Sequence, residues 1–336
     1  MPHLELFIDI PPALGDVRPI FILTVINLAS GYLFAARRAY LFARMFGFVA
    51  TIYHTFFLVV SSVVRIWILA ATHSYAAYVA SGIFFGVLED VALHYFLGTS
   101  YPFLRDNSQK LDRADKNEIK SQVGALFFHR LGSIITGSCD NLSIMAFMGL
   151  SAGTIYSNYT MIANSIMSFI NLAAGSVAAS LGNLGASEGG AKMYGIWKKA
   201  TVCIFAISLI IAPTLFLACP IIIKLWLGEE YVLDRSTTFC LCASFFILAN
   251  RSVMLVFRDA LGLYKKEIMK PFAEVATNLP LTLFLTPRFG IKGAIIGQGA
   301  GMLVCLIWEY LLVRNELCRR KNNQKSNRSI MKISHK

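Results

Sequence analysis

The chain has 336 residues, of which 56% are hydrophobic and only 15% are charged. Soluble domains carry roughly 25% charged residues, because a chain folded in water needs a largely polar surface. This composition excludes an ordinary soluble protein and indicates a multi-span membrane protein. The net charge of +12 does not indicate nucleic-acid binding, because eight basic residues lie in the last 23 positions. The seven cysteines show no metal-ligand spacing, so we expect neither a disulfide framework nor a metal site.

Nine stretches of the chain are apolar and long enough to cross a bilayer, which takes about 20 residues. We therefore predict an all-α polytopic membrane protein with about nine transmembrane helices. The longest charged interruption follows the third stretch, which predicts three helices before it and six after it. The nine spans are expected at 18–36, 46–71, 74–97, 122–149, 152–181, 198–219, 236–257, 269–286 and 291–313.

Basic residues are distributed unequally between the two sides of the membrane that these spans define. One side holds 23 of them and the other holds 5, while Arg65, Arg130 and Arg251 lie inside spans. Because short basic connections stay in the cytoplasm, the bias predicts a cytoplasmic C-terminus and an external N-terminus. No positively charged leader precedes the first apolar run, which we expect to remain in the mature protein.

The fourth and fifth spans carry polar side chains at helical spacing. The stripes are made of Ser133, Thr136, Asp140 and Asn141 on the fourth span and of Asn164, Ser168 and Asn171 on the fifth. Uncharged polar residues commonly join membrane helices by close approach and hydrogen bonds. Helix packing is therefore the more common explanation for them, and contact with a polar ligand is the alternative.

Charged residues inside a span are harder to explain by packing alone. Asp140 and Arg251 each cost about 2.5–3.5 kcal/mol at a helix centre, so we favour a functional role for both. Arg130 and Arg258 lie near the cytoplasmic ends of their spans, which also allows an ordinary interfacial role.

Two further groups of polar residues occur near span ends. Asp90 and His94 are one helical turn apart, so they could bind a proton or a cation. An interfacial cluster neutralised by neighbouring basic residues explains them equally well. Glu274 and Asn278 are also one turn apart, just before the helix-breaking Pro280.

Catalytic motifs are scarce in this sequence. The segment GLSAG at 149–153 has the pattern of a serine nucleophile, but it lies in a turn between two predicted helices and lacks the strand that presents such a serine. No phosphate-binding glycine loop or metal motif is found. We therefore predict that the protein is not an enzyme.

An ordered set of motifs runs along the chain. The motifs are ALFFHRLGSIITGSCDNLSIMAFMGLSAGTIYSNYTMI, SVAASLGNL, IIKLWLGEEYVL, FRDALGLYKKEIMKPFAEVATNLP and FGIKGAIIGQG. This set resembles the C-terminal part of bacterial polysaccharide flippases, which belong to the multidrug, oligosaccharidyl-lipid and polysaccharide exporter superfamily. The resemblance covers residues 18–320, and the residues Cys139, Asp140 and Asn141 occupy the place of the family's TDN tripeptide.

The resemblance implies a fold with two lobes of six helices around a central cavity. On that alignment the first three helices are absent, and the chain could be an inactive fragment. Residues 1–98 would be a three-helix remnant of the N-terminal lobe and residues 99–121 a cytoplasmic linker. Residues 122–315 would form the complete C-terminal lobe, and 316–336 a basic cytoplasmic tail.

The function implied is flipping of polyprenyl-pyrophosphate-linked oligosaccharide across the bacterial cytoplasmic membrane by alternating access, together with other polysaccharide assembly proteins. No cofactor is expected beyond coupling to protons or Na+. A multidrug exporter of the same superfamily and a membrane polysaccharide polymerase or ligase are the alternatives. The last would need a large external loop, which the sequence lacks.

The expected site residues follow from the chemistry of this substrate. Arginine pairs bidentately with phosphate oxygens, so the headgroup candidates are Arg251, Arg130 and Arg258. The sugar-facing candidates are Ser133, Thr136, Asn141, Asn164, Ser168 and Asn171, and the ion-coupling candidates are Asp140, Asp90, His94 and Glu274.

Overall fold

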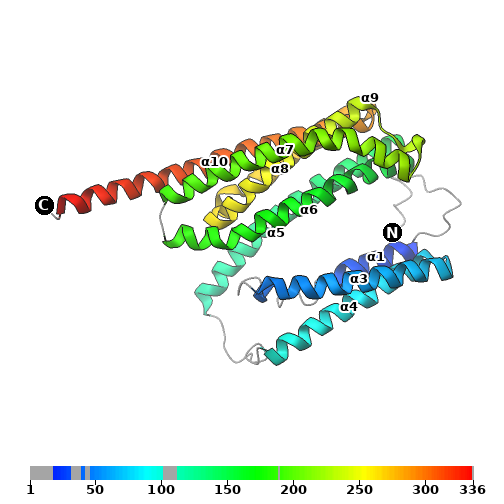
Figure 1. Cartoon of the computed structure of the whole chain (residues 1–336), viewed down its shortest axis with the longest axis horizontal. Coiled ribbons are helices and arrows are strands. Elements are labelled where there is room, and N and C mark those ends of the chain that lie inside the picture. Colours follow the sequence, from blue (N-terminus) through cyan, green and yellow to red (C-terminus); the bar gives the residue numbers. More distant parts are fainter. Residues whose placement is uncertain (1–17, 32–38, 42–45, 101–111, 188–189, 335–336) are drawn as a thin grey trace. The chain divides into compact units, whose positions relative to one another are not determined.

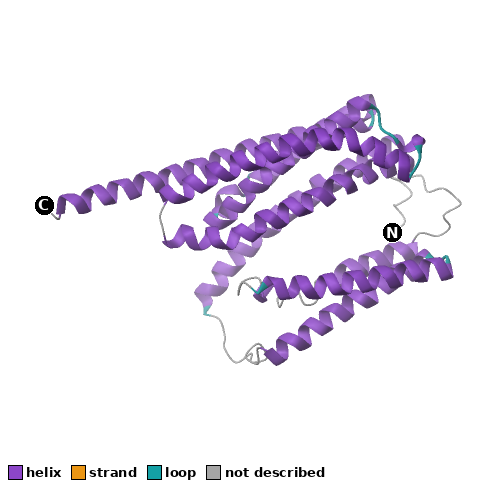
Figure 2. Cartoon of the chain, viewed as in Figure 1, coloured by secondary structure: helices purple, strands orange, loops and turns teal. Residues whose placement is uncertain are grey.

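The computed structural model describes residues 18–31, 39–41, 46–100, 112–187 and 190–334, apart from some side chains within the helices. All regular structure in these ranges is helical (Figure 2). In the described residues, three of the helices given below precede the charged interruption and six follow it, as the sequence predicts, although the first of them has only 13 residues. They are α1 (Arg18–Ser30), α3 (Gly47–Thr72), α4 (Tyr75–Ser100), α5 (Arg113–Met148), α6 (Leu150–Ser187), α7 (Gly190–Trp226), α8 (Arg235–Leu261), α9 (Lys270–Phe289) and α10 (Ile291–Ser334) (Figure 1).

The helices form two compact units, which we call the three-helix unit (α1, α3 and α4) and the six-helix unit (α5 to α10). In the three-helix unit, α4 packs against both α1 and α3. Its buried apolar core is small and consists of Leu41, Ala50, Leu93 and Leu97. Large apolar side chains of α3 are exposed, such as Trp67 at 70%, as expected of a surface that meets lipid.

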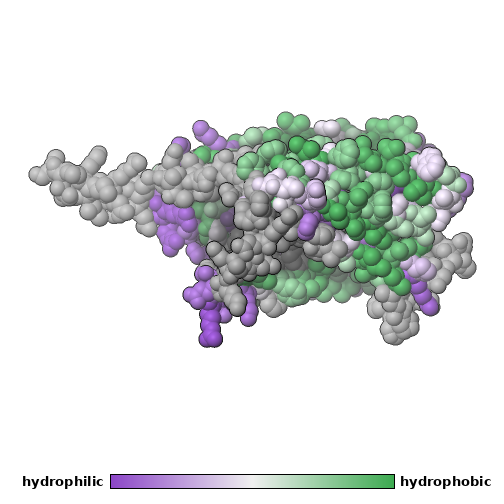
Figure 3. All heavy atoms as spheres, turned by 90° about the horizontal axis from the view of Figure 1, so that it is seen from below, coloured by the Kyte–Doolittle hydropathy of each residue, from purple (hydrophilic) through white to green (hydrophobic). Residues whose placement is uncertain are grey.

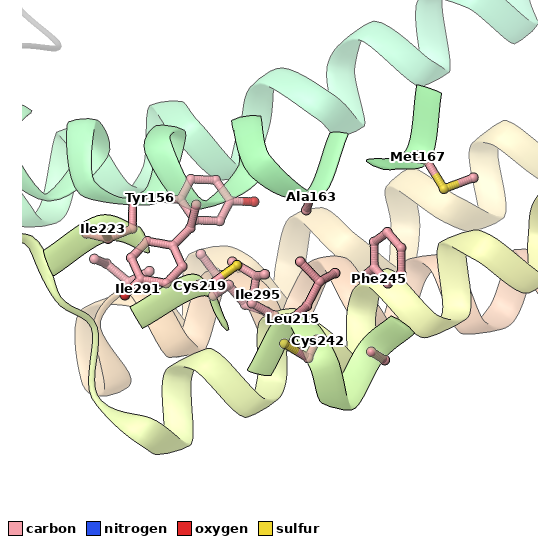
Figure 4. Packing of buried hydrophobic residues seen from close by; sticks show 14 of the residues in the cluster. Tyr156, Ala163, Met167, Leu215, Cys219, Ile223, Cys242, Phe245, Ile291 and Ile295 are labelled. Carbon is pink, nitrogen blue, oxygen red and sulfur yellow. The ribbon is translucent and has the colours of Figure 1, made fainter. Parts of the chain in front are cut away.

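The six-helix unit has a larger core. One buried cluster joins α6, α7, α8 and α10 and includes Tyr156, Cys219, Phe245 and Ile295 (Figure 4). A second joins the beginning of α7, the end of α8 and the middle of α10, around Trp197 and Phe257. Together the two clusters join α6, α7, α8 and α10, and Ile144 of α5 belongs to the first.

Several helices are longer than the apolar stretches that predict them. Helix α5 begins nine residues earlier than its expected span and α10 continues to Ser334 instead of ending near 313. The polar segments next to these spans contain good helix formers, so the backbone hydrogen bonds continue past the apolar region. Figure 1 shows α10 extending beyond its neighbours α7 and α8.

Five helical segments in the described residues are long and apolar enough to cross a membrane: Gly47–Thr72, Tyr75–Ser100, Ala191–Trp226, Arg235–Leu261 and Ile291–Asn322. Figure 3 shows broad apolar areas on the visible face, with hydrophilic side chains gathered mainly toward its ends. This distribution is that of a multi-pass membrane protein.

The short 3-10 helices η4 (Glu229–Tyr231) and η5 (Leu263–Glu267) occupy two connections of the six-helix unit. Helix α8 begins at a capping residue, Asp234, whose side chain accepts hydrogen bonds from the backbone N–H groups of Ser236 and Thr237. Hydrogen bonds from the side chains of Ser236 and Thr237, together with those from their backbone N–H groups, hold the pKa of Asp234 at about 2. Helix α8 ends at Gly262, whose φ of 67° belongs to the left-handed region that favours glycine.

Candidate functional site

A buried acid lies in the six-helix unit where α5 meets α9. Asp140 of α5 is only 1% exposed, and the hydroxyl of Thr282 on α9 donates a hydrogen bond to its Oδ1 over 3.2 Å. Its Oδ2 atom is buried and has no hydrogen-bond partner among the described residues. No basic side chain forms an ion pair with Asp140 in the described part of the chain. A carboxylate so placed is poised to bind a proton or a small cation, because no described basic side chain neutralises it.

Neutral oxygen-bearing side chains surround this carboxylate. Asn278 and Gln298 interact with Asp140 from α9 and α10, although neither has hydrogen-bonding geometry to Oδ2. The Thr282 hydroxyl lies 3.0 Å from Oδ1 of Asn278, and the Tyr156 hydroxyl lies 3.4 Å from Oε1 of Gln298. We call Asp140, Tyr156, Asn278, Thr282 and Gln298 the acid site.

A proline adds a further oxygen to this region of α9. Pro280 lies between Asn278 and Thr282 and has no backbone N–H. The carbonyl oxygen of Ala276, four residues earlier, therefore loses its intrahelical partner. Helix α9 nevertheless continues without interruption from Lys270 to Phe289.

A small cavity of about 90 Å³ adjoins the acid site. Such a volume holds a few waters or a hydrated small ion, but not a sugar unit with its headgroup. Tyr156, Ala163, Phe245 and Ile295 line it from α6, α8 and α10. The same four side chains are labelled in Figure 4. The other lining residues are Thr160, Asn164, Leu241, Ser244, Leu248, Gln298 and Met302.

A second polar region of the six-helix unit consists of charged side chains. Six of them alternate in sign along a connected series, and each is at most 9% exposed. We call this series the charge chain. Its members, in order, are Arg258, Glu267, Lys270, Glu309, Arg251 and Glu274.

Arg251 is the most completely paired member of the charge chain. Its Nη1 and Nη2 atoms donate to the two carboxylate oxygens of Glu274 over 2.9 and 3.2 Å, and its Nε donates to Glu309 over 3.2 Å. All three guanidinium nitrogens are therefore engaged by carboxylates. The guanidinium group of Arg251, which was expected to bind a pyrophosphate, is hydrogen-bonded to Glu274 and Glu309 in this conformation.

The rest of the charge chain ties the connection between α8 and α9 to α10. Lys270, only 1% exposed, donates to Glu309 over 2.5 Å and lies 3.9 Å from Glu267. Arg258 donates to Glu267 over 3.1 Å and also pairs with Asp259 over 2.7 Å. The charge chain thus joins α8, η5, α9 and α10.

The other headgroup candidate and part of the sugar-facing stripe lie where side chains are not described. Arg130, Ser133 and Thr136 belong to α5, and only their backbone is described. Asn141 is half-buried and its Oδ1 accepts a hydrogen bond from Ser157 over 3.3 Å, which joins α5 to α6. The remaining stripe residues of α6 are exposed, and they are Asn164, Ser168 and Asn171.

The candidate pair Asp90 and His94 lies on α4 in the three-helix unit. Asp90 is buried and His94 is half-buried. The neighbouring Glu89 is buried as well, and its carboxylate lies 3.3 Å from Nδ1 of His54 on α3. This contact between α3 and α4 was not predicted from the sequence. Glu274, the fourth ion-coupling candidate, belongs to the charge chain and not to the acid site.

Several residues of both regions escaped the sequence analysis, although signals for some of them were present. Lys270, Glu274, Asn278, Thr282 and Thr286 recur at every fourth position of α9 and are all buried. That repeat could have identified a polar face. Glu309 is an isolated acid within an apolar span, which is a similar signal. Gln298 had no comparable signal, because glutamine is also common at helix contacts.

No family model matches the sequence. A search of curated proteins also finds no match. The structure is similar to a solved structure titled "Crystal structure of MATE in complex with MaL6", with a TM-score of 0.61 and 14% sequence identity. The likeness covers 91% of this chain and 77% of that chain. The chain therefore has a MATE-like membrane fold.

Proposed function

We propose that this chain is a membrane exporter that couples transport to a monovalent cation or a proton bound at Asp140. The observation that carries the proposal is the buried carboxylate, which has one unpartnered oxygen and no basic neighbour among the described residues. A single negative charge among neutral oxygens suits H+ or Na+. Divalent cations bind preferentially where several carboxylates converge.

Transport is favoured over other roles by the fold. The similar solved structure is that of a MATE protein, and MATE transporters belong to the exporter superfamily that the sequence resembles. Folds of this type alternate between two access states around a central substrate site. An ion site inside one group of helices can bias such an equilibrium if the ion binds one state more tightly than the other.

For the substrate, we propose a polyprenyl-pyrophosphate-linked oligosaccharide, as the sequence motifs suggest. The exposed polar residues Asn164, Ser168 and Asn171 would meet the sugar. Arg251 remains a headgroup candidate only if substrate displaces Glu274 or Glu309 from it. Export of a lipophilic cation is the second candidate function, and the MATE-like fold favours it.

We further propose that the protein resides in the bacterial cytoplasmic membrane with the C-terminal end of α10 on the cytoplasmic side. The excess of basic residues on that side supports this orientation. Labelling of Cys318 by a membrane-impermeant maleimide should then occur in inverted vesicles and not in intact cells. Labelling in intact cells only would reverse the proposed orientation.

The function is tested with purified protein in proteoliposomes. One set of vesicles contains a fluorescent short-chain polyprenyl-pyrophosphate oligosaccharide and another contains a fluorescent lipophilic cation, each under an imposed Na+ or pH gradient. We expect gradient-dependent movement of the first substrate and at least a tenfold loss of coupling in Asp140→Asn. Movement of the lipophilic cation alone would establish the second candidate. Identical rates with and without gradients in both Asp140→Asn and the unaltered chain would refute coupling at Asp140.

A further inference from the structure

The charge chain pairs three buried cations with three buried carboxylates, each at most 9% exposed. At one end, Arg258 also pairs with the partly exposed Asp259. Removing one member leaves an opposite charge without its partner in a medium of low dielectric constant, whereas removing an adjacent pair leaves the net charge of the cluster unchanged. Arg251 and Glu274 form such a pair at the other end of the chain.

The charge chain continues directly into the acid site along one face of α9. Lys270, Glu274, Asn278 and Thr282 follow at intervals of four residues, so they lie in a row on the same side of the helix. All four are at most 7% exposed. The first two belong to the charge chain and the last two to the acid site. One helix therefore connects the two regions.

Glycines of α10 pack directly over the same row. A Cβ atom at Gly301 would lie 3.0 Å from Cβ of Asn278, and one at Gly297 would lie 2.7 Å from the backbone nitrogen of Thr282. The two helices approach too closely for any side chain to intervene. A small displacement of α9 relative to α10 would consequently move Asn278 and Thr282 with respect to Asp140.

From these contacts we infer that the charge chain is a clamp that holds α9 in register with α8 and α10 and thereby sets the cation affinity of the acid site. Arg251, Glu274 and Glu309 are positioning residues for Asp140, which they do not contact. The inference rests on the proposed cation binding at Asp140 for its functional part. The mechanical part stands on the geometry of α9 alone.

The test uses the full chain in nanodiscs and the double substitution Arg251→Met with Glu274→Leu. Three quantities are measured: the unfolding temperature, the affinity for Na+ in a titration with NaCl against choline chloride, and the amide hydrogen exchange of residues 276–284. We expect an unfolding temperature close to that of the unaltered protein, at least a tenfold weaker affinity for Na+ and faster exchange in α9. A purely stabilising role would leave both affinity and exchange unchanged, which would overturn the inference.

A control removes a different set of charges of the same unit. Lys266 of η5 pairs with Glu316 of α10 over 2.9 Å, and Glu316 also accepts hydrogen bonds from Arg319 and Arg320. None of these four residues belongs to the row on α9. The double substitution Lys266→Met with Glu316→Leu should leave both the affinity for Na+ and the exchange of α9 unchanged. An equal loss of affinity in this control would also contradict the inference, because the effect would not be specific to the charge chain.

Two other outcomes remain informative. If the first double variant does not fold, Glu274→Gln takes its place, because the amide preserves the shape and removes the charge. If the unaltered protein and Asp140→Asn both fail to bind Na+, the sodium form of the proposed function is wrong. The amide hydrogen exchange of the double variant then tests the inferred clamp by itself. Faster exchange in α9 supports the clamp, and unchanged exchange rejects it.

Discussion

Helices α3 and α8 are similar in length and each contains an 18-residue window of the same mean hydropathy, yet they are used differently. Only 6% of the apolar window of α3 is buried, against 56% for α8. Helix α8 buries Asn250, Arg251 and Arg258 together with apolar residues, whereas α3 buries only Ala50 and Ser61 among its described side chains. Mean hydropathy therefore identifies a membrane helix, but polar residues within it indicate which helices form the packed interior.

The largest change in the free energy of unfolding is expected where a buried charge of α8 loses its partner. Glu309→Ala removes the carboxylate shared by Arg251 and Lys270, and we expect it to lower the free energy of unfolding by about 3–5 kcal/mol. Ser62→Ala on the exposed face of α3 should change it by less than about 0.5 kcal/mol. Thermal unfolding in detergent micelles measures both. Equal effects would mean that the charge chain is not buried as described.

Close packing provides the next contrast. Gly297→Ala on α10 would push against the backbone of Thr282, and we expect a destabilisation of about 1–3 kcal/mol. Gly86→Ala on α4 meets no atom within 4 Å, so it should be neutral or stabilise by up to about 1 kcal/mol. Unfolding temperatures of the two variants test this contrast. Equal changes of the unfolding temperature in Gly297→Ala and Gly86→Ala would contradict this prediction.

A smaller effect is expected at the beginning of α8, which has a side-chain cap that α3 lacks. Asp234→Ala should lower the free energy of unfolding by about 1 kcal/mol at neutral pH. The pKa of Asp234 is about 2 in the folded protein and roughly 3.9 when unfolded. Its charge therefore stabilises the fold fully above pH of about 4, and this contribution is lost as the pH falls toward 2.

Unfolding curves of Asp234→Ala and the unaltered protein, recorded at a series of pH values, should converge over that interval. A difference that stays constant from neutral pH down to about 2 would show that the charge of Asp234 does not contribute.

The smallest effect is expected at an exposed ion pair near the end of α7. Lys224 lies 2.7 Å from Glu229, and both side chains are largely exposed. Water and salt screen such pairs, so Lys224→Ala should not measurably change the unfolding temperature at physiological ionic strength. A clear decrease would place this connection in a less polar environment than its exposure indicates.

The sequence was sufficient to predict the helices because apolar runs of about 20 residues have few alternatives in a membrane protein. It could not give the helix ends. The polar segments beside α5, α7 and α10 continue as helix, since membrane thickness limits the apolar stretch and not the hydrogen-bonded backbone. Lys270 illustrates a related difficulty, because it was counted among the basic residues of a connection and is buried beside Glu309.

The functional regions were predicted less completely. Asp140 and Arg251 were recognised because charges inside spans are rare, and Glu274 because it lies one turn before Asn278. Glu309, the other partner of Arg251, was missed, since these two residues are 58 positions apart and only tertiary packing brings them together. Periodicity reports which residues share a face of one helix, but not which helix that face meets. Hence Arg251 was expected to bind substrate, whereas it pairs with two acids in the structure.

The length of α10 has a mechanical consequence. At 1.5 Å per residue its 44 residues extend roughly 66 Å, about twice the thickness of the hydrocarbon layer. Gln298 lies near its beginning, and Ser334 follows roughly 54 Å further along the axis. If α10 moves as a rigid rod, a rotation of about 10° around Gln298 displaces Ser334 by about 9 Å. The helix would act as a lever, so that a distance probe at its far end magnifies a change too small to measure at the acid site.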